Sequence, residues 1–236
     1  MLELSVIMPA YNEEDGIQRA VHDIRRDVLD VVKQAELVVV DDGSKDRTGA
    51  LLDQLAAEDP RIRVLHQSNQ GHGPALRAGL DAAQGDFLLL VDGDGQIPLE
   101  NFATFWRTTS MLDGIIGIRQ NRQDPRHRLV LSSAVRLLLR ILFDIRLADA
   151  NIPFKLIRSS VWREARPLIP ADCRIPSLFL AVFLATRRAR FEQIPVSHRA
   201  RETGKTTLQY GRLAAFCWGA MRQLILFRRN LYAGIH

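Results

Sequence analysis

Two carboxylates one residue apart, Asp92 and Asp94, are the sharpest chemical feature of this 236-residue chain. They follow an apolar run at residues 87–91, which has the length of a buried strand. At a strand end, residues two apart point the same way, and neighbouring carboxylates repel each other unless a cation lies between them. Oxygen ligands of this kind, with Gln96 as a third, suit Mg²⁺ or Mn²⁺ that bridges a diphosphate. The plainer alternative is a solvated Asp-Gly turn.

Three more polar clusters follow short apolar runs at residues 4–8, 37–40 and 62–66. The clusters are Tyr11-Asn12-Glu13, Asp41-Asp42-Gly43-Ser44 and Asn69-Gln70-Gly71-His72-Gly73. Asp and Gly are ordinary turn residues, so one such loop would be weak support for a site. The carboxyl ends of parallel strands meet at one edge of a sheet, however, and four loops in register there predict a shared site.

Helical patterns separate these runs and indicate how the loops are positioned. The apolar positions are Ile17, Val21, Ile24, Val28 and Val31, then Leu51, Leu52 and Leu55, then Ala75, Leu76, Ala78, Leu80 and Ala82. The alternation predicts an α/β fold, namely a doubly wound, mostly parallel sheet with helices on both faces. Farther along, we expect strands at residues 114–119 and 189–196 and amphipathic helices at 129–147 and 207–229.

The charge is divided unequally along the chain. Residues 1–116 hold 10 Lys and Arg against 20 Asp and Glu, whereas residues 117–236 hold 22 against 7, and 20 of the 22 are arginine. An acidic half can hold a cation, and an Arg-rich half suits phosphate, an anionic membrane surface or nucleic acid, unless the halves simply neutralise each other. Because the chain lacks G-x-x-x-x-G-K-[ST], and its first turn lacks G-x-G-x-x-G, bound phosphates are expected to depend on metal and arginine.

The composition excludes several other classes of protein. With 47% hydrophobic and 25% charged residues, the chain is not predominantly disordered. Two cysteines without CxxC or Cys/His spacing exclude a disulfide framework and a zinc site. No apolar run reaches the roughly 18–20 residues of a membrane span, and the start has no basic region before an apolar stretch. We expect a single domain, 1–236, with an acidic lobe at 1–116 and a basic lobe at 117–236, inside the cell.

The successive motifs resemble those of family 2 glycosyltransferases. They are Val6-Ile7-Met8-Pro9-Ala10-Tyr11-Asn12-Glu13-Glu14, Val39-Val40-Asp41-Asp42-Gly43-Ser44-Lys45-Asp46-Arg47-Thr48, Asn69-Gln70-Gly71 with Ala75-Leu76-Arg77-Ala78-Gly79, and Asp92-Gly93-Asp94-Gly95-Gln96. The resemblance implies a GT-A fold, a GDP- or UDP-linked sugar donor, a divalent metal and inversion at the anomeric carbon. It places Pro9, Tyr11, Glu13, Val39 and Asp41 around the nucleoside, and Asp92, Gly93, Asp94 and Gln96 at the metal and donor phosphates.

The second half resembles the polyprenyl-phosphate glycosyltransferases, and among them the dolichol-phosphate mannose synthases. The matching segments are Gly117-Ile118-Arg119, residues 149–155 and residues 195–205. The resemblance implies that the acceptor phosphate is bound by Arg119, Arg128, Ser132 and Arg201, and Lys205 in the same loop is a further candidate for this phosphate. The chain departs from the family pattern at Ile152-Pro153, where Ser-Gly is usual, and at Thr206, where Ser is usual, so the acceptor stays open.

The two possible kinds of acceptor differ in whether they need a general base. A phosphomonoester has a second pKa of about 6, so near neutral pH it is already largely ionised and needs no general base. A hydroxyl must lose its proton to a base, and Asp149 is then the expected catalytic residue beside Asp92 and Asp94. His72 either contacts a donor phosphate or is a solvated turn residue.

The basic half allows two further interpretations. An RNA-binding protein fits the arginines but not the acidic strand-end loops, and no aromatic-rich basic strand motif is present, so nucleic acid is not expected as a partner. The helices at 129–147 and 207–229 carry arginines beside apolar faces, which suits lipid headgroups as well as packing. We therefore expect a peripheral protein on the cytoplasmic face of a membrane, alone or with a membrane protein partner.

Overall fold

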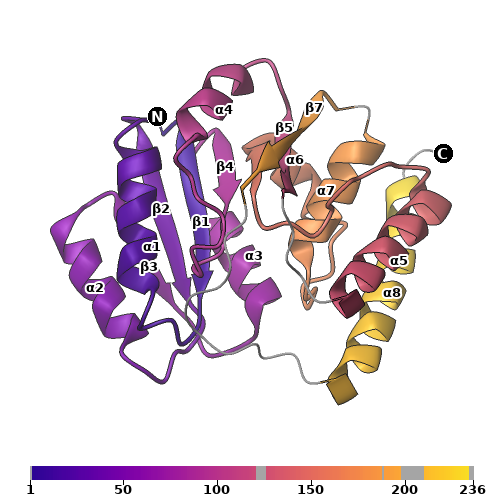
Figure 1. Ribbon diagram of the computed structural model, residues 1–236, viewed down its shortest axis with the longest axis horizontal. Coiled ribbons are helices and arrows are strands. Elements are labelled where there is room, and N and C mark those ends of the chain that lie inside the picture. The colour runs from indigo at the N-terminus through magenta and orange to yellow at the C-terminus, as the bar shows by residue number, and fades with distance from the viewer. Residues whose placement is uncertain (1, 121–125, 188, 198–209, 234–236) are drawn as a thin grey trace.

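The computed structural model describes residues 2–120, 126–187, 189–197 and 210–233, and their side chains except at 126–131 and 210–217. A seven-stranded sheet in the order β3-β2-β1-β4-β6-β5-β7 forms its centre (Figure 1). The strands are β1 (Leu4–Ala10), β2 (Ala35–Asp41), β3 (Ile62–His66), β4 (Phe87–Leu90), β5 (Gly114–Arg119), β6 (Lys155–Arg158) and β7 (Phe191–Val196). Only β6 runs antiparallel to its neighbours. The predicted mostly parallel α/β sheet is therefore confirmed.

Helices cover both faces of the sheet (Figure 1). They are α1 (Ile17–Ile24) with its π-helical continuation η1 (Arg25–Leu29), α2 (Thr48–Glu58), α3 (His72–Ala82), α4 (Phe102–Thr109), α5 (Arg126–Phe143), α6 (Ser159–Ala165), α7 (Pro176–Thr186) and α8 (Tyr210–Ala233). The α1–η1 helix contacts α2 and α4, whereas α7 contacts α3 and α6. A right-handed crossover from β3 at the sheet edge to β4 at its centre places α3 on the face opposite α1 and α2.

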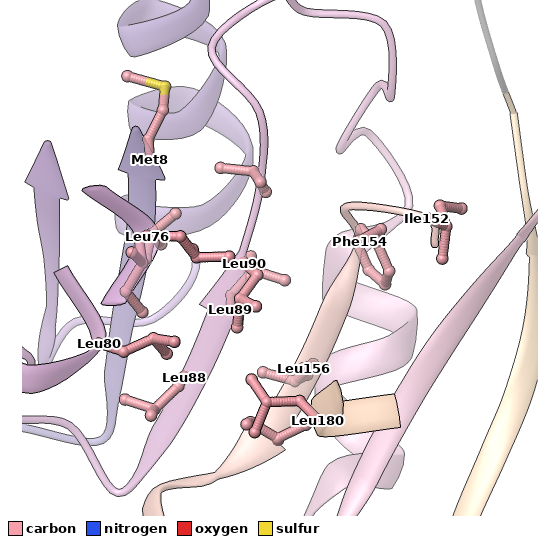
Figure 2. Close-up of a cluster of buried hydrophobic side chains, with 14 of the residues drawn as sticks. Met8, Leu76, Leu80, Leu88, Leu89, Leu90, Ile152, Phe154, Leu156 and Leu180 are labelled. Atoms are coloured by element: carbon pink, nitrogen blue, oxygen red, sulfur yellow. The ribbon is translucent and has the colours of Figure 1, made fainter. Parts of the chain in front are cut away.

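A continuous apolar core joins the two halves of the chain. Figure 2 shows side chains from β1, α3, β4, β6, the segment just before β6, and α7 in one cluster, with Met8, Leu76, Leu80, Leu88, Leu89, Leu90, Ile152, Phe154, Leu156 and Leu180 labelled. Helix α7 is buried at every position from Pro176 to Leu184. This short apolar segment is thus a core helix, and it ties the strands after β4 to those before it.

The starts of α3 and α7 are held close to each other by a glycine. A Cβ atom at Gly73, in the first turn of α3, would lie 2.0 Å from the carbonyl oxygen of Cys173, just before α7. Any side chain at this position would push the two segments apart. The approach fixes two helix starts beside the carboxyl edge of the sheet.

Helices α5 and α8 lie side by side at the far end of the molecule from β3 (Figure 1). The rings of Phe143 and Phe227 lie 6.3 Å apart, and Arg228 Nε donates to the carbonyl oxygen of Leu142 at 2.6 Å. Among the described helices, none combines the length and the apolar character that crossing a bilayer requires.

Some element boundaries differ from the sequence predictions for local reasons. The helix predicted at 129–147 ends at Phe143, because Asp144 adopts a positive φ of 53°. Val31, expected on a helix face, is 43% exposed because η1 ends two residues earlier. Strand β6 was not predicted, since its four residues begin with Lys155 and end with Arg158. Residues 207–209 of the predicted last helix lie outside the described residues.

Candidate active site

The carboxyl ends of β1, β2, β3 and β4 meet at one edge of the sheet. Their four loops surround one hollow of about 660 Å³, which we call the acidic hollow. Pro9, Tyr11 and Glu13, predicted at the nucleoside, line it together with Asp92, Gly93 and Asp94, predicted at the donor phosphates. Its other lining residues are Ala10, Asn12, Asp42, Asn69, Gly71, His72 and Ala75. The structure therefore brings together the four loops whose meeting the parallel sheet predicts.

Asp92 and Asp94 are half-buried, and both line this hollow. Asp94 Oδ1 accepts a hydrogen bond from the backbone N–H of Gln96 at 3.1 Å, and His72 Nε2 lies 3.8 Å from Asp92 Oδ1. Gln96 is not part of the lining. Over the described ranges, no three His, Cys, Asp or Glu side chains gather closely enough to hold a metal ion. Since Mg²⁺ usually binds to one or two carboxylates together with substrate phosphates, the pair fits an ion that binds with a diphosphate.

The glycine-rich loop after β3 is held by Asp42, which is 2% exposed. Asp42 Oδ1 accepts from Gln67 Nε2 at 2.7 Å and from the backbone N–H of Gln70 at 2.9 Å, and its Oδ2 accepts from the N–H of Gly71 at 2.8 Å. Hydrogen bonds from backbone groups to a charged acceptor are among the strong ones. Asp42 therefore shapes the wall of the hollow that this loop forms.

The neighbouring Asp41 points away from the hollow. Its Oδ1 accepts from the backbone N–H of Ser44 at 3.0 Å, and its Oδ2 lies 3.0 Å from His66 Nδ1. The other ring nitrogen of His66 lies 2.9 Å from Asp53 Oδ1, and hydrogen bonds to Asp53 and Asp41 raise the pKa of this imidazole. Val39 is fully buried within β2. Of the five residues predicted at the nucleoside, Asp41 and Val39 do not line the hollow.

Strand β5 brings an arginine to the same edge of the sheet. Arg119 donates from Nε to Asp149 Oδ2 at 2.7 Å and from Nη2 to Asp149 Oδ1 at 2.9 Å. The two side chains are only 16% and 5% exposed. A bidentate arginine–carboxylate pair fixes both partners in one plane. The predicted acceptor-phosphate arginine and the predicted general base thus form one unit.

A fully buried lysine lies at the start of β6, close to this pair. Lys155 Nζ donates to Ser177 Oγ at 2.7 Å and to the carbonyl oxygen of Ile152. Burial lowers the pKa of Lys155 to about 7, although the carboxylates of Asp149 and Asp92 favour its charged form. Lys155 therefore ties the loop after Asp149 to the start of α7.

A second hollow, of about 480 Å³, lies among α5, α7 and α8, and we call it the apolar groove. Leu138, Leu178 and Leu224 are among its walls, and it reaches Asp149 and Asn151. The half-buried Ser132, predicted at the acceptor phosphate, also lines it. The side chain of Arg128, and Arg201 and Lys205 entirely, lie outside the described residues.

A family model described as glycosyl transferase family 2 matches residues 5–164, which include the acidic hollow and the Arg119–Asp149 pair. The chain belongs to glycosyl transferase family 2. The family predicted from the four motifs is therefore confirmed.

Two curated relatives of this glycosyltransferase are named undecaprenyl-phosphate 4-deoxy-4-formamido-L-arabinose transferase. The protein from Edwardsiella ictaluri is 31% identical over 212 residues, which are 88% of this chain and 63% of the relative. The protein from Pseudomonas fluorescens is 28% identical over 206 residues, which are 85% of this chain and 58% of the relative. The chain thus spans less than two thirds of their length. The predicted likeness to polyprenyl-phosphate glycosyltransferases is confirmed, whereas the sugar in these names is an aminoarabinose derivative and not mannose.

Solved structures confirm the predicted GT-A fold of this glycosyltransferase. Glucosyl-3-phosphoglycerate synthase from Mycobacterium tuberculosis, in complex with Mn²⁺, UDP and phosphoglyceric acid, has a TM-score of 0.70 and 20% identity over 96% of this chain and 78% of that one. A mannosyltransferase from Pyrobaculum calidifontis, in complex with GDP-mannose and Mn²⁺, has a TM-score of 0.66 and 18% identity over 98% of this chain and 69% of that one. At such low identity the likeness supports the fold alone.

Several residues of the site had no individual role in the sequence predictions. Asp42 and Asn69 line the acidic hollow, and Lys155 donates a hydrogen bond to Ser177 at the start of α7. A signal for Asp42 was present, because successive strand-end residues point to opposite sides and only one of Asp41 and Asp42 can face the hollow. A signal for Lys155 was its place as the one charged residue among Ile152-Pro153-Phe154 and Leu156-Ile157.

Proposed function

We propose that this glycosyltransferase moves a sugar from a GDP- or UDP-linked donor to a polyprenyl phosphate, with inversion at the anomeric carbon and with Mg²⁺ or Mn²⁺. One observation carries the proposal. The apolar groove reaches the Arg119–Asp149 pair, and this pair stands at the same sheet edge as the acidic hollow. An apolar chain in the groove would bring its phosphate to an arginine beside the donor.

The proposed reaction needs no general acid or base from the protein. An oxygen of the acceptor phosphate attacks the anomeric carbon, the bond from this carbon to the donor diphosphate breaks, and the nucleoside diphosphate leaves. No proton is transferred, since the acceptor is already ionised. Asp92 and Asp94 would hold the divalent cation, which stabilises the charge on the departing diphosphate. Arg119, fixed in its plane by Asp149, would orient the acceptor phosphate.

Transfer to a hydroxyl, with Asp149 as the base, agrees less well with the geometry. Both oxygens of Asp149 accept hydrogen bonds from Arg119. To take a proton, this carboxylate would have to give up part of a buried charge pair, which is unfavourable. The pair instead suits a site that is built around an anion.

The direct test is a panel of radiolabelled nucleotide sugars with undecaprenyl phosphate in detergent or vesicles, followed by organic extraction. We expect label in the lipid phase only when Mg²⁺ or Mn²⁺ is present. Label that appears only in hydrophilic glycans would contradict the lipid acceptor, and no transfer from any donor would contradict the proposed activity.

A bulky side chain in the apolar groove should raise the KM for long acceptors and not for short ones. Ala220 lines the groove, so Ala220→Trp should raise the KM for undecaprenyl phosphate about tenfold or more, since several buried methylene groups lose their contacts. A short prenyl phosphate that does not fill the groove should be used as before. The measurement is initial rate against acceptor concentration for both lengths.

The neighbouring residue supplies a matched control. A Cβ at Gly219 would meet no atom within 4 Å, and Gly219 is not part of the groove lining. Gly219→Trp should therefore leave the KM for both acceptors unchanged. Equal effects of the two variants would show that the groove does not hold the acceptor chain.

The outer surfaces of α5 and α8 support contact with a membrane. Leu137, Ile141, Trp218, Ile225 and Leu226 are between 47% and 71% exposed, and the first two also line the apolar groove. Arg140, Arg222 and Arg229 are exposed on the same two helices. Arginines at headgroup level with apolar side chains below them are typical of interfacial helices. We place this face, peripherally, on the cytoplasmic side of a membrane, alone or beside a membrane protein partner.

Vesicle flotation tests this placement. The Trp218→Glu/Ile225→Glu double variant should lose most of its binding to vesicles that contain anionic lipid, because two exposed apolar anchors outside the groove lining become charged. Met111 is 72% exposed at the end of α4, so Met111→Glu is the matched control and should bind as the unaltered protein does. Equal binding by all three proteins would exclude this face as the membrane contact.

A further inference from the structure

A third hollow connects the acidic hollow to the apolar groove, and we call it the connecting chamber. His72 and Asp92 line both the chamber and the acidic hollow. Asn151 and Ile175 line both the chamber and the apolar groove. Among the residues that the structure describes, the acidic hollow and the groove share no lining residue with each other. The chamber therefore lies between a donor in one and an acceptor in the other.

The size of the chamber suits one small group and not a nucleoside. Its volume is about 130 Å³, against about 660 Å³ for the acidic hollow. At the minimum of about 10–15 Å³ that one water needs, the chamber has room for roughly ten waters. This is the size range of a single sugar ring.

The walls of the chamber have the chemistry that a sugar needs. Apolar walls such as Leu76 and Pro153 alternate with a few polar groups, which are His72, Asp92, Asn151 and Ser177. A sugar ring has apolar C–H faces and a rim of hydroxyls, so it matches a small cavity with few, well-placed polar groups. Of the described residues, no arginine or lysine lines the chamber, in contrast to what a phosphate would require.

The backbone around the chamber is fixed on both sides. The contact between Gly73 and Cys173 sets the start of α3, where His72 lies, against the segment that leads into α7. Lys155 joins Ser177 at the start of α7 to Ile152, next to Asn151. His72 and Asn151 are themselves exposed residues on these fixed segments. Their side chains can therefore differ between enzymes without disturbing the fold, which is what a residue that sets specificity requires.

We propose that the connecting chamber binds the sugar of the donor, and that His72 and Asn151 determine which sugar is accepted. The inference rests on the proposed function and adds to it the place of the transferred group. A sugar in the chamber has its anomeric carbon between Asp92, on the diphosphate side, and Asn151, on the acceptor side. This is the arrangement that an in-line displacement needs.

The test separates binding of the sugar from binding of the nucleotide. Calorimetry with Mn²⁺ first shows whether UDP or GDP binds, and then gives Kd for two sugars on that nucleotide, UDP-glucose and UDP-N-acetylglucosamine or GDP-mannose and GDP-glucose. The variants are His72→Ala and Asn151→Ala. Asn151 does not line the acidic hollow, so Asn151→Ala should leave Kd for the nucleoside diphosphate within about twofold. The ratio of Kd values for the two sugars should change about fivefold in at least one variant, the effect of one lost hydrogen bond.

Matched controls are His22→Ala and Asn101→Ala, two exposed residues outside all three hollows, which should change neither quantity. An unchanged sugar ratio in both chamber variants, with nucleotide binding intact, would overturn the chamber as the sugar site. If the unaltered protein binds neither UDP nor GDP in the presence of Mn²⁺, the proposed function itself fails, and the inference fails with it.

Discussion

Replacement of either Asp92 or Asp94 by asparagine is expected to lower glycosyl transfer by about a thousandfold. Both carboxylates line the hollow where the donor diphosphate would lie. Asparagine keeps the shape but removes one negative charge from a pair that would hold a divalent cation, and stabilisation by such a cation contributes several kcal/mol. With each 1.36 kcal/mol worth a factor of ten, a loss of about 10³ follows.

Two measurements distinguish this loss from general damage to the fold. Thermal unfolding with UDP or GDP should show stabilisation by Mn²⁺ in the unaltered protein and little in either variant, because a ligand stabilises only the state that binds it. Glu58→Gln removes one charge from an exposed position on α2 and should behave as the unaltered protein does. Full activity and full Mn²⁺ dependence in Asp92→Asn would contradict the metal assignment.

The elements that the sequence predicts best are those with one clear pattern. Strands β1 to β4 are short apolar runs that end in turn residues, and their order along the chain already implies a parallel sheet. Helix α7 has no such pattern, because it is buried on all sides and a periodic signal needs one face in water. Strand β6 is hidden by Lys155, a residue type that is almost never fully buried.

Site residues that are close in sequence are also easier to predict than those that the fold brings together. Asp92 and Asp94 are two residues apart in the turn after β4, so their closeness along the chain is enough to bring both to the same hollow. Arg119 and Asp149 are 30 residues apart, and their contact depends on β5 and β6 lying side by side. The groove depends likewise on how α5, α7 and α8 pack. The sequence therefore predicts the donor-side carboxylates, whereas the geometry of the acceptor side follows only from the tertiary fold.

Lys155 should make the stability of this protein depend on pH in an unusual direction. Burial lowers its pKa from the ordinary 10.5 to about 7. Between these two values the unfolded chain keeps a proton that the folded chain has released, so this residue makes stability rise with pH; below pH 7 both states are protonated and the cost of burial is constant. The slope is at most about 1.4 kcal/mol per pH unit, so from pH 7 to pH 9 the contribution is about 2 kcal/mol.

The Lys155→Met variant removes this titration while it keeps an unbranched side chain in the core. Relative to this variant, the unaltered protein should gain about 2 kcal/mol of unfolding free energy between pH 7 and pH 9, measured by urea unfolding at both pH values. Lys33→Met, at an exposed position, should show no such difference. A constant difference between the Lys155→Met variant and the unaltered protein would mean that the buried ammonium ionises as it does in water. A rising difference would show that Lys155 loses its proton in the folded protein over this range, because its charge is costly to bury. The side chain joins Ser177 to the loop after Asp149, so its removal should also lower turnover.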